Sequence, residues 1–404
     1  MRSIKLSPGG RRRSLAAAGF CALAATMLTV AGCGAAASGA DAPGAKHTTV
    51  VSSSHPTSPA GFTVLSMTFV SDRQGFALGT VKCGSRKCTA VLGTTNGGTT
   101  WRALASPVKR AAGPYDTCPS GQPCVSQVRF ATPEIGYAFA PSLFLTTDGG
   151  AHWRHLGGLN VTSLEAADGN VVRVASSGAG CSGMPYKVQQ AAFGGTAWHA
   201  LSAPAIVMIC PPLLYRQGER LVLVGYGNPA GGVRATAELD RSANDGSTWA
   251  SGPDQCGGKD GYAAAVALAP PNGLLLLCRH QQPDKAGNFG TAWIRVSTNG
   301  GASFGPDRQV IAPAGVPASQ TIGYQVAAAS ASRLLVDVQG EHGNRVLLST
   351  NGGRGWKTTL QPSGSGPVIL VGFTDSATAR VAQGDLAWTT HDGGQRWITD
   401  HFPA

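Results

Sequence analysis

The segment Thr94-Thr95-Asn96-Gly97-Gly98-Thr99-Thr100-Trp101 decides the fold, because close versions of it return along the whole chain. Each clean copy has Ser or Thr, then Asn or Asp two residues later, glycine two further on, and an aromatic residue three after that. A worn copy, between the second and third clean ones, keeps only Gly195 and Trp198. In the six clean copies the Asn or Asp, the glycine and the aromatic residue are Asn96, Gly98, Trp101; Asp148, Gly150, Trp153; Asn244, Gly246, Trp249; Asn299, Gly301, Phe304; Asn351, Gly353, Trp356; and Asp392, Gly394, Trp397.

The spacing of the copies predicts a repeat architecture. Successive aromatic residues lie 52, 45, 51, 55, 52 and 41 residues apart, and six of the eight tryptophans occupy this one position. A regular period of this length indicates that each repeat is one supersecondary unit that packs against its neighbours.

The residue types predict a hairpin turn with a structural role at each copy. An Asn or Asp side chain accepts hydrogen bonds from backbone N–H groups about two residues on. Glycine adopts the positive φ angle that a tight turn needs. The aromatic residue is expected to start the next strand and to pack its face over the turn and the neighbouring sheet.

The segments between the turns read as short strands, so the fold class is all-β. In the first repeat we expect strands at 64–70, 76–82, 89–95 and 101–105, and in the last at 368–374, 380–383, 386–390 and 396–402. Four strands in each unit of roughly 50 residues match the blade of a β-propeller. Seven turns therefore predict a seven-bladed propeller of four-stranded antiparallel blades over residues 61–404.

The repeats resemble the BNR/Asp-box repeats of the sialidase-like superfamily. Two segments, FVSDRQGFAL at 69–78 and FATPEIGYAF at 130–139, are most similar to propellers of the photosystem II assembly factor type. That resemblance implies a binding or assembly role without catalysis.

The first 33 residues have the features of an export signal. Basic residues up to Arg13 precede an apolar stretch of residues 15–29, which is too short to span a bilayer comfortably. Val30-Ala31-Gly32-Cys33 resembles the lipobox of bacterial lipoproteins, which implies cleavage after residue 32 and acylation of Cys33 with diacylglycerol and a fatty acid such as palmitate.

Two further features bear on the same expectation. Residues 33–60 are rich in small and polar residues and predict a flexible tether. The expected location is the extracytoplasmic face of the cell membrane. An ordinary secretory signal is the alternative, and Arg12-Arg13 leaves twin-arginine export open.

Charge narrows the choice of partners. Removal of the five basic residues before Cys33 lowers the formal net charge from +11 to +6. This mild excess of positive charge favours binding to anionic surfaces. The sequence has no Lys/Arg stripe with interleaved aromatic residues, so it does not predict nucleic-acid binding. We expect no cofactor and no metal site, and a monomeric chain.

Eight cysteines follow Cys33, and an even count in an exported chain predicts disulfides. Eight cysteines allow 105 pairings. The order of strands in the blades favours Cys83–Cys88, Cys118–Cys124, Cys181–Cys210 and Cys256–Cys278. Zinc binding is the alternative, although no CxxC pair occurs.

All eight cysteines are expected on the face opposite the repeated turns. We call this the stapled face; it carries the loops between the second and third strands and the connections between blades. The opposite side is the turn face. Long loops on a rigid ring are common sites of binding. The candidate binding residues on the stapled face are Arg86, Lys87, Tyr115, Tyr186, Lys259, Arg279, His280 and Lys285. A solvated rim without a partner is the alternative.

We predict a non-catalytic chain that binds a protein or a cell-envelope polymer. The alternatives are an exo-sialidase-like glycoside hydrolase and a carbohydrate-binding module without turnover. Sialidases need clustered arginines and a Tyr–Glu pair, and the Arg-Ile-Pro of that family is missing near the first blade. Tyrosines and arginines outside any family context are Tyr215, Tyr226, Tyr262, Tyr324, Arg216, Arg220, Arg234 and Arg333.

Carboxylates are scarce, and glycosidases usually need two of them. Those not used in turns include Glu219, Glu238 and Asp240, with Asp337 and Glu341 the most interesting pair. We assign no catalytic residue. Clustered arginines with a Tyr–Glu pair around the axis would favour the enzyme, whereas a flat, basic, aromatic rim would favour binding.

Overall fold

The computed structural model describes residues 61–110, 112, 118, 121–178, 185–204, 212–226, 237–253, 255–256, 261–280, 292–310, 322–340 and 343–403. These residues form strands β1 to β28 in seven four-stranded sheets. The described part contains no α-helix, and therefore no helical segment able to cross a bilayer.

Each sheet is one blade of consecutive strands. Blades 1 to 4 contain β1 (Thr63–Phe69), β2 (Gly75–Cys83), β3 (Arg86–Thr94) and β4 (Arg102–Leu104); β5 (Gln127–Phe130), β6 (Gly136–Phe139), β7 (Leu143–Thr146) and β8 (Arg154–Leu156); β9 (Asn160–Ala167), β10 (Asn170–Ser176), β11 (Tyr186–Ala192) and β12 (His199–Ala200); and β13 (Leu213–Gln217), β14 (Arg220–Tyr226), β15 (Ala237–Ser242) and β16 (Ala250–Pro253). Blades 5 to 7 contain β17 (Gly261–Ala269), β18 (Gly273–His280), β19 (Trp293–Ser297) and β20 (Arg308–Gln309); β21 (Ile322–Ala328), β22 (Leu334–Gly340), β23 (Gly343–Ser349) and β24 (Lys357–Leu360); and β25 (Val368–Phe373), β26 (Ala379–Gln383), β27 (Leu386–Thr390) and β28 (Ile398–His401).

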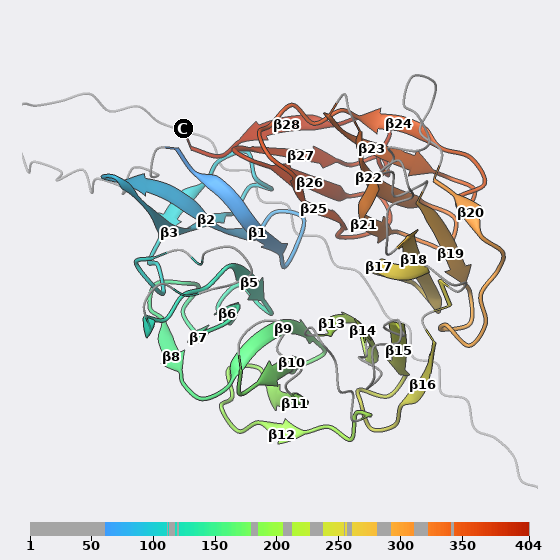
Figure 1. The fold of residues 1–404 in the computed structure, drawn as a ribbon. Helices are drawn as coiled ribbons and strands as arrows, with labels where there is room; N and C mark the ends of the chain where they lie inside the picture. Colours follow the sequence, from blue (N-terminus) through green and yellow to red (C-terminus); the bar gives the residue numbers. More distant parts are fainter. Residues whose placement is uncertain are drawn as a thin grey trace, which may run out of the picture. The chain divides into compact units, whose positions relative to one another are not determined.

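The blades close into a ring (Figure 1). The first strand of each blade is innermost and contacts the first strand of the next, and β25 contacts β1 in turn. All pairings within the blades are antiparallel. The seven-bladed propeller predicted from the turns is confirmed.

The apolar core is divided into seven clusters, one between each pair of neighbouring blades. Alternation along each strand produces this division, since successive side chains point to opposite faces of a sheet. On β2, Phe76 and Leu78 pack toward blade 2, whereas Ala77 packs toward blade 7. Phe62 and Phe402, whose ring centroids lie 5.1 Å apart, help to join the ends of the chain.

The innermost strands are also linked by side chains next to β-bulges. A bulge places one extra residue in β1 before Ser66, in β9 before Ser163 and in β21 before Gln325. Ser66 Oγ accepts the N–H of Val128 at 3.1 Å, and Ser163 Oγ accepts that of Leu214 at 3.1 Å. Each bond joins one blade to the next across the inner wall of the ring, where a bulge redirects the side chain.

The repeated turn is held by two side chains. In all six clean copies the Ser or Thr hydroxyl accepts the N–H of the glycine four residues later, at 2.8–3.1 Å. The Asn or Asp Oδ1 accepts the N–H of the residue four positions on, at 2.9–3.0 Å. The sequence-based expectation placed the N–H donor to the Asn or Asp about two residues on, which was wrong, and it did not foresee the bond of the hydroxyl.

The aromatic residue also differs from expectation, because it precedes the fourth strand rather than starting it. Strand β4 begins at Arg102 and β8 at Arg154, one residue after Trp101 and Trp153. Because the residue lies outside the strand, its indole can reach the preceding blade: Trp153 Nε1 donates to the carbonyl of Ala105 at 2.9 Å.

Two turns of each blade lie together on the turn face. In the six blades with clean copies, the residue three positions after the turn's Ser or Thr donates its N–H to a backbone carbonyl at 2.7–2.9 Å. That carbonyl lies in the turn between the first and second strands. Five of these donors are glycines, and all six have positive φ. This pairing confirms that the turn face and the stapled face are opposite sides of the ring.

We predict that Thr146→Ala lowers the free energy of unfolding by about 1–3 kcal/mol, because the substitution leaves the buried N–H of Gly150 without its acceptor. Chemical denaturation of the purified chain measures the change. Thr147→Ala, at an exposed neighbouring threonine, is the control and should leave stability nearly unchanged. Equal losses in both variants would contradict the role assigned to the hydroxyl.

Candidate functional site

Three of the four expected disulfides are present on the stapled face: Cys83–Cys88, Cys118–Cys124 and Cys256–Cys278. The first closes the β2–β3 hairpin, the second lies between β4 and β5, and the third ties the segment after β16 to the end of β18. Cys181 and Cys210, like Cys33, lie outside the described residues. In the part of the chain that the structure describes, no three His, Cys, Asp or Glu side chains gather as a metal site.

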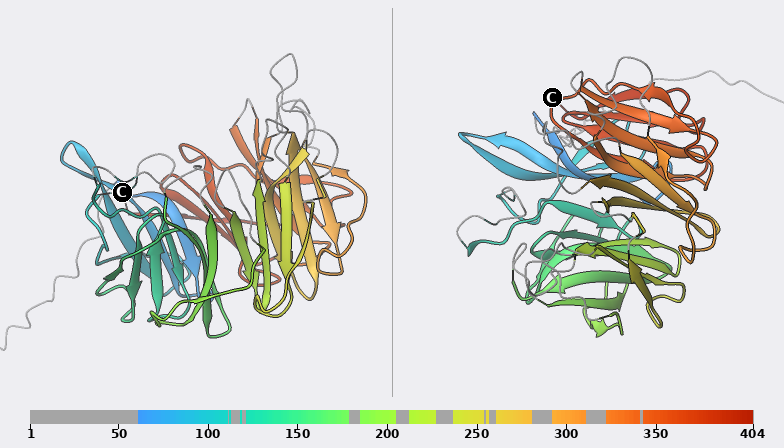
Figure 2. Two further views of the ribbon diagram at one scale, coloured as in Figure 1. Left: turned by 60° about the horizontal axis from the view of Figure 1, so that its bottom comes forward. Right: turned by 45° about the vertical axis from the view of Figure 1, so that its right-hand side comes forward.

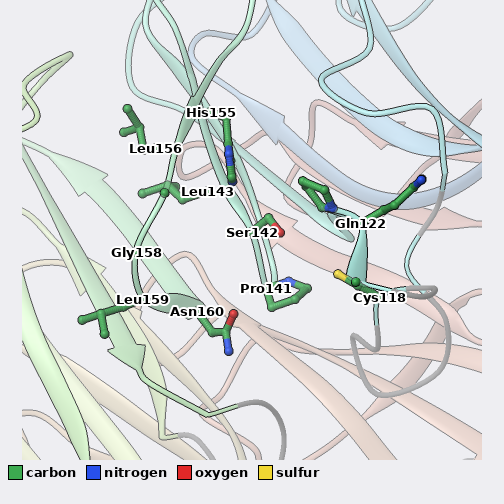
Figure 3. A pocket seen from close by; sticks show the side chains of 13 residues that line it. Cys118, Gln122, Pro141, Ser142, Leu143, His155, Leu156, Gly158, Leu159 and Asn160 are labelled. Atoms are coloured by element: carbon green, nitrogen blue, oxygen red, sulfur yellow. The ribbon is translucent and has the colours of Figure 1, made fainter.

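A groove of about 410 Å³ opens on this face between blades 2 and 3, which we call the blade 2–3 groove. Figure 3 shows Cys118 and Gln122 on one side, Leu159 and Asn160 on the other, and Ser142 between them. The three parts come from the β4–β5 connection, the β8–β9 connection and the β6–β7 turn.

Hydrogen bonds and the disulfide hold these walls in place. Ser142 donates its N–H to the carbonyl of Cys124 at 3.2 Å, and Ser142 Oγ accepts the N–H of Cys124 at 3.3 Å. Val161 donates its N–H to the carbonyl of Pro141 at 2.8 Å, which joins blade 3 to blade 2 at the base of the groove. The groove is therefore built from backbone that three independent contacts fix.

Among the described residues, the lining of the groove includes no Asp, Glu, Lys or Arg. Its polar groups are the neutral side chains of Gln122, Ser142 and Asn160, together with His155, which lies with its ring 4.7 Å from that of Phe144. Leucine and proline side chains supply the remaining surface. Such a lining suits an uncharged segment that offers both hydrogen-bonding groups and apolar groups.

The described residues among those predicted for binding lie on separate blades. Arg86 and Lys87 are exposed at the start of β3, on a hairpin that projects past the neighbouring sheets (Figure 2). Tyr186 begins β11 in blade 3, and Arg279 and His280 end β18 in blade 5. Tyr115, Lys259 and Lys285 lie outside the described residues. The described candidates thus belong to three blades that are not neighbours.

Sequence reasoning missed the blade 2–3 groove because it looked for basic and aromatic residues. The usable signal was the segment Gly157-Gly158-Leu159-Asn160, in a connection facing the loop that carries Cys118 and Cys124. Gly158 has a φ of 110°, which glycine adopts readily, and this part of the wall has no side chain.

Around the axis, the innermost strands bring together residues that the enzyme alternative requires. Arg129 of β5 and Glu165 of β9 form an ion pair with a distance of 2.7 Å. Arg216 and Tyr215 of β13 lie close enough to interact electrostatically with Glu165. Burial raises the pKa of Glu165 in spite of the two arginines.

The bonds within this cluster do not match sialidase chemistry. The Arg216 side chain is 1% exposed and is bound to Asp245 at 2.8 Å and to two backbone carbonyls, so it has no access to a substrate. Arg129 is occupied by Glu165. Burial raises the pKa of Tyr215 to about 12, which opposes ionisation of a nucleophile. The cluster ties blades 2, 3 and 4 together.

Of the pair of carboxylates singled out from the sequence, Glu341 lies outside the described residues. Asp337 of β22 is 1% exposed, and its Oδ1 has no hydrogen-bond partner among the described residues. Burial raises the pKa of Asp337 to about 7. A carboxyl so enclosed cannot reach a glycosidic bond, and its main effect is on stability.

Comparisons with known proteins agree with the architecture. No family model and no curated protein matches the sequence. Among solved structures, one described as YCF48 bound to D1 peptide is similar, with a TM-score of 0.52 and 16% identity over 86% of this chain and 96% of that one. An ancestral GH74 enzyme has a TM-score of 0.53 and 12% identity, over 86% of this chain and 47% of the enzyme.

A puromycin-hydrolysing peptidase of Mycobacterium tuberculosis has a TM-score of 0.54 and 15% identity, over 85% of this chain and 55% of the peptidase. Enzymes and a peptide-bound protein therefore share this propeller. At such identities the likeness establishes the fold alone, so function has to be argued from the site.

We predict that Asp337→Asn stabilises the protein at about pH 8 and leaves it little changed at about pH 4. The folded state holds the Asp337 proton more tightly than the unfolded state, so the wild type loses stability as the pH rises from about 4 to above 7. The difference between wild type and variant should grow by about 4 kcal/mol over that range.

Denaturant unfolding at a series of pH values measures this difference. Asp385→Asn, at an exposed carboxylate of blade 7, is the control and should follow the wild type. A wild type that gained stability relative to Asp337→Asn across the same range would show that the carboxyl is ionised and paired.

Proposed function

We propose that this chain is an extracytoplasmic lipoprotein, anchored through Cys33, whose propeller binds a protein or cell-envelope partner through the stapled face without catalysing a reaction. The observation that carries the proposal is the blade 2–3 groove, a fixed and uncharged cleft among the disulfide-closed loops. Its walls suit an extended, uncharged stretch of a protein partner.

Two further points support a binding role. The similar propeller described as bound to a D1 peptide is matched over 96% of its chain, and it is an example of this fold with a peptide as its partner. The charged groups of the cluster are already bound: Arg129 pairs with Glu165 across blades 2 and 3, and Arg216 pairs with Asp245 within blade 4 and donates to the carbonyl of Asn170 in blade 3. Turnover of fluorogenic sialosides or β-glucans by the purified full chain would overturn the non-catalytic part of the proposal.

We predict that a photo-cross-linking amino acid at position 122 captures a discrete partner in the native envelope, because Gln122 stands at the edge of the blade 2–3 groove. The same probe at position 152, on the turn face, is the matched control, since His152 is equally exposed. Gel shifts followed by mass spectrometry identify the adducts.

Asn160→Ala in the chain that carries the probe at position 122 should reduce the yield of that adduct several-fold, since it removes a hydrogen-bonding group from the opposite wall. Identical adducts from positions 122 and 152, or an adduct insensitive to the change at Asn160, would reject the groove as the partner site.

We predict that Cys33→Ala abolishes incorporation of labelled palmitate during expression of the full chain in a bacterial host, because the acylated residue is lost. Cys21→Ala, a second cysteine within the export signal, is the control and should be labelled like the wild type. Autoradiography or click detection of the purified protein measures labelling. Label retained by the Cys33 variant would refute lipidation at this residue without touching the proposal for the groove.

A further inference from the structure

A second pocket lies between blades 4 and 5, at the end of the ring that carries the repeated turns. It has a volume of about 520 Å³ and includes Arg220 and Arg241 in its lining, with no Asp or Glu. Trp249 forms part of the wall, and Asn272 supplies an exposed amide. We call it the arginine pocket. Its volume is within the usual range for sites of small molecules.

Arg220 is held as part of the scaffold. Its Nη2 donates to the carbonyl of Gly273 at 2.8 Å, and its Nη1 lies within 3.3 Å of the carbonyls of Ala269 and Pro271. These bonds join blade 4 to blade 5 and leave the positive charge without a carboxylate partner among the described residues.

Arg241 is placed beside it without any such bond. The side chain crosses to blade 5 over the bare Cα of Gly301, where an added Cβ would lie 2.8 Å from Arg241 Cδ. Its Nε is buried, and in the described part of the chain it has neither a hydrogen-bond partner nor an ion pair. Asp240, the preceding residue, points to the opposite side of the strand. The residue as a whole is half-buried and lines the pocket, so the rest of the guanidinium can bind an anion there.

The other blades provide an internal comparison. The residue before the turn's Ser or Thr is Gly93, Leu145, Val296, Leu348 or Thr389 in the other clean copies, and only blade 4 has an arginine there. Blade 6 has Arg333 where blade 4 has Arg220, and Arg333 donates to the carbonyl of Gly393 at 2.9 Å. There Leu348 packs toward the turn glycine Gly394.

One arginine therefore suffices to join two blades, as blade 6 demonstrates. The stem of the second arginine packs over Gly301, but its Nε forms no hydrogen bond within the described residues, so blade 4 carries a positive charge that the joint between blades does not use. We propose that the arginine pocket binds a small organic oxyanion, a carboxylate or phosphate ester on a polar body, with the Arg241 guanidinium donating to the anion.

The chemistry of the pocket fits such a ligand. A guanidinium presents a planar pair of N–H groups that matches two oxygens of a carboxylate or phosphate. Arg220 adds a fixed positive charge on the same wall. The indole N–H of Trp249 is occupied by the carbonyl of Gly246 at 3.0 Å, so the ring is held as a flat apolar wall for the body of the ligand. Asn272 offers hydrogen bonds to its hydroxyl groups.

The inference goes beyond the proposed function, because the arginine pocket and the blade 2–3 groove lie at opposite ends of the blades. The test is isothermal titration and saturation-transfer NMR on the full chain with four probes: glucose 6-phosphate, glucuronate, neutral glucose and inorganic phosphate. We expect one or both anionic sugars to bind, glucose not to bind, and inorganic phosphate to bind more weakly than glucose 6-phosphate. Preference between the two anions assigns the ligand to phosphate esters or to carboxylates.

Arg241→Gln should weaken binding by about 10-fold or more, the loss expected for a charged hydrogen-bonding group. Arg333→Gln, at the equivalent of Arg220 in blade 6, is the matched control and should bind like the wild type. Thermal unfolding of both variants checks that they are folded, and cross-linking from position 122 should be unchanged in Arg241→Gln.

Three results would overturn the inference: no binding of either anionic sugar at about 20 mM, affinity unchanged by Arg241→Gln, or inorganic phosphate bound as tightly as glucose 6-phosphate. None of these results would bear on the stapled face, where the proposed partner is tested separately.

Discussion

The ring depends on one short hydrogen bond, in which a Ser or Thr hydroxyl at the end of a third strand accepts the N–H of a buried glycine four residues later. That bond fixes the path of the turn, and the fixed path brings a second N–H to the turn between the first two strands. It also sets the direction of the aromatic residue, so that the indole of Trp153 bonds to the preceding blade. A local turn thereby determines how one sheet packs on the next.

Blade 3 shows what happens when this hydroxyl is missing. Its worn turn has no Ser, Thr, Asn or Asp at the matching positions. The N–H of Gly195, the matching glycine, is accepted by the carbonyl of Ala192 at 2.9 Å, and the N–H of Gly194 is accepted by the phenol oxygen of Tyr137 in blade 2 at 2.9 Å. The guanidinium of Arg173 lies 3.9 Å from the ring of Trp198, which keeps the tryptophan in its usual place. The constraint is the satisfied N–H: a backbone carbonyl of the same turn replaces the hydroxyl, and a phenol of the neighbouring blade binds the N–H before it.

This explains which features the sequence could predict. The turn, the strands and the number of blades are local and repeated, so six copies of one pattern specify them. The pairs Cys83–Cys88 and Cys118–Cys124 are close in sequence and followed from the order of strands. The blade 2–3 groove and the arginine pocket could not be predicted, since each is formed where two blades meet, and the contact between Arg241 and Gly301 joins residues 60 positions apart. The described candidate binding residues lie on three separate blades, as their order relative to the repeated turns already implies.

Departures from the repeat are therefore the most informative residues of this chain. Asp245 stands where the other five clean copies have glycine, at a φ of 55° that disfavours side chains but that Asp tolerates better than most residues. The departure has a structural cause: the carboxylate binds Arg216 at 2.8 Å and the amide of Gln190, which joins blade 4 to the blade that lacks the standard turn. Arg241, four residues earlier, is a second departure in the same blade, yet it makes no such bond. Asp245 is explained by the bonds it makes, whereas packing of the Arg241 stem over Gly301 explains the stem and not the charge at its end, which is the reason for proposing an anionic ligand.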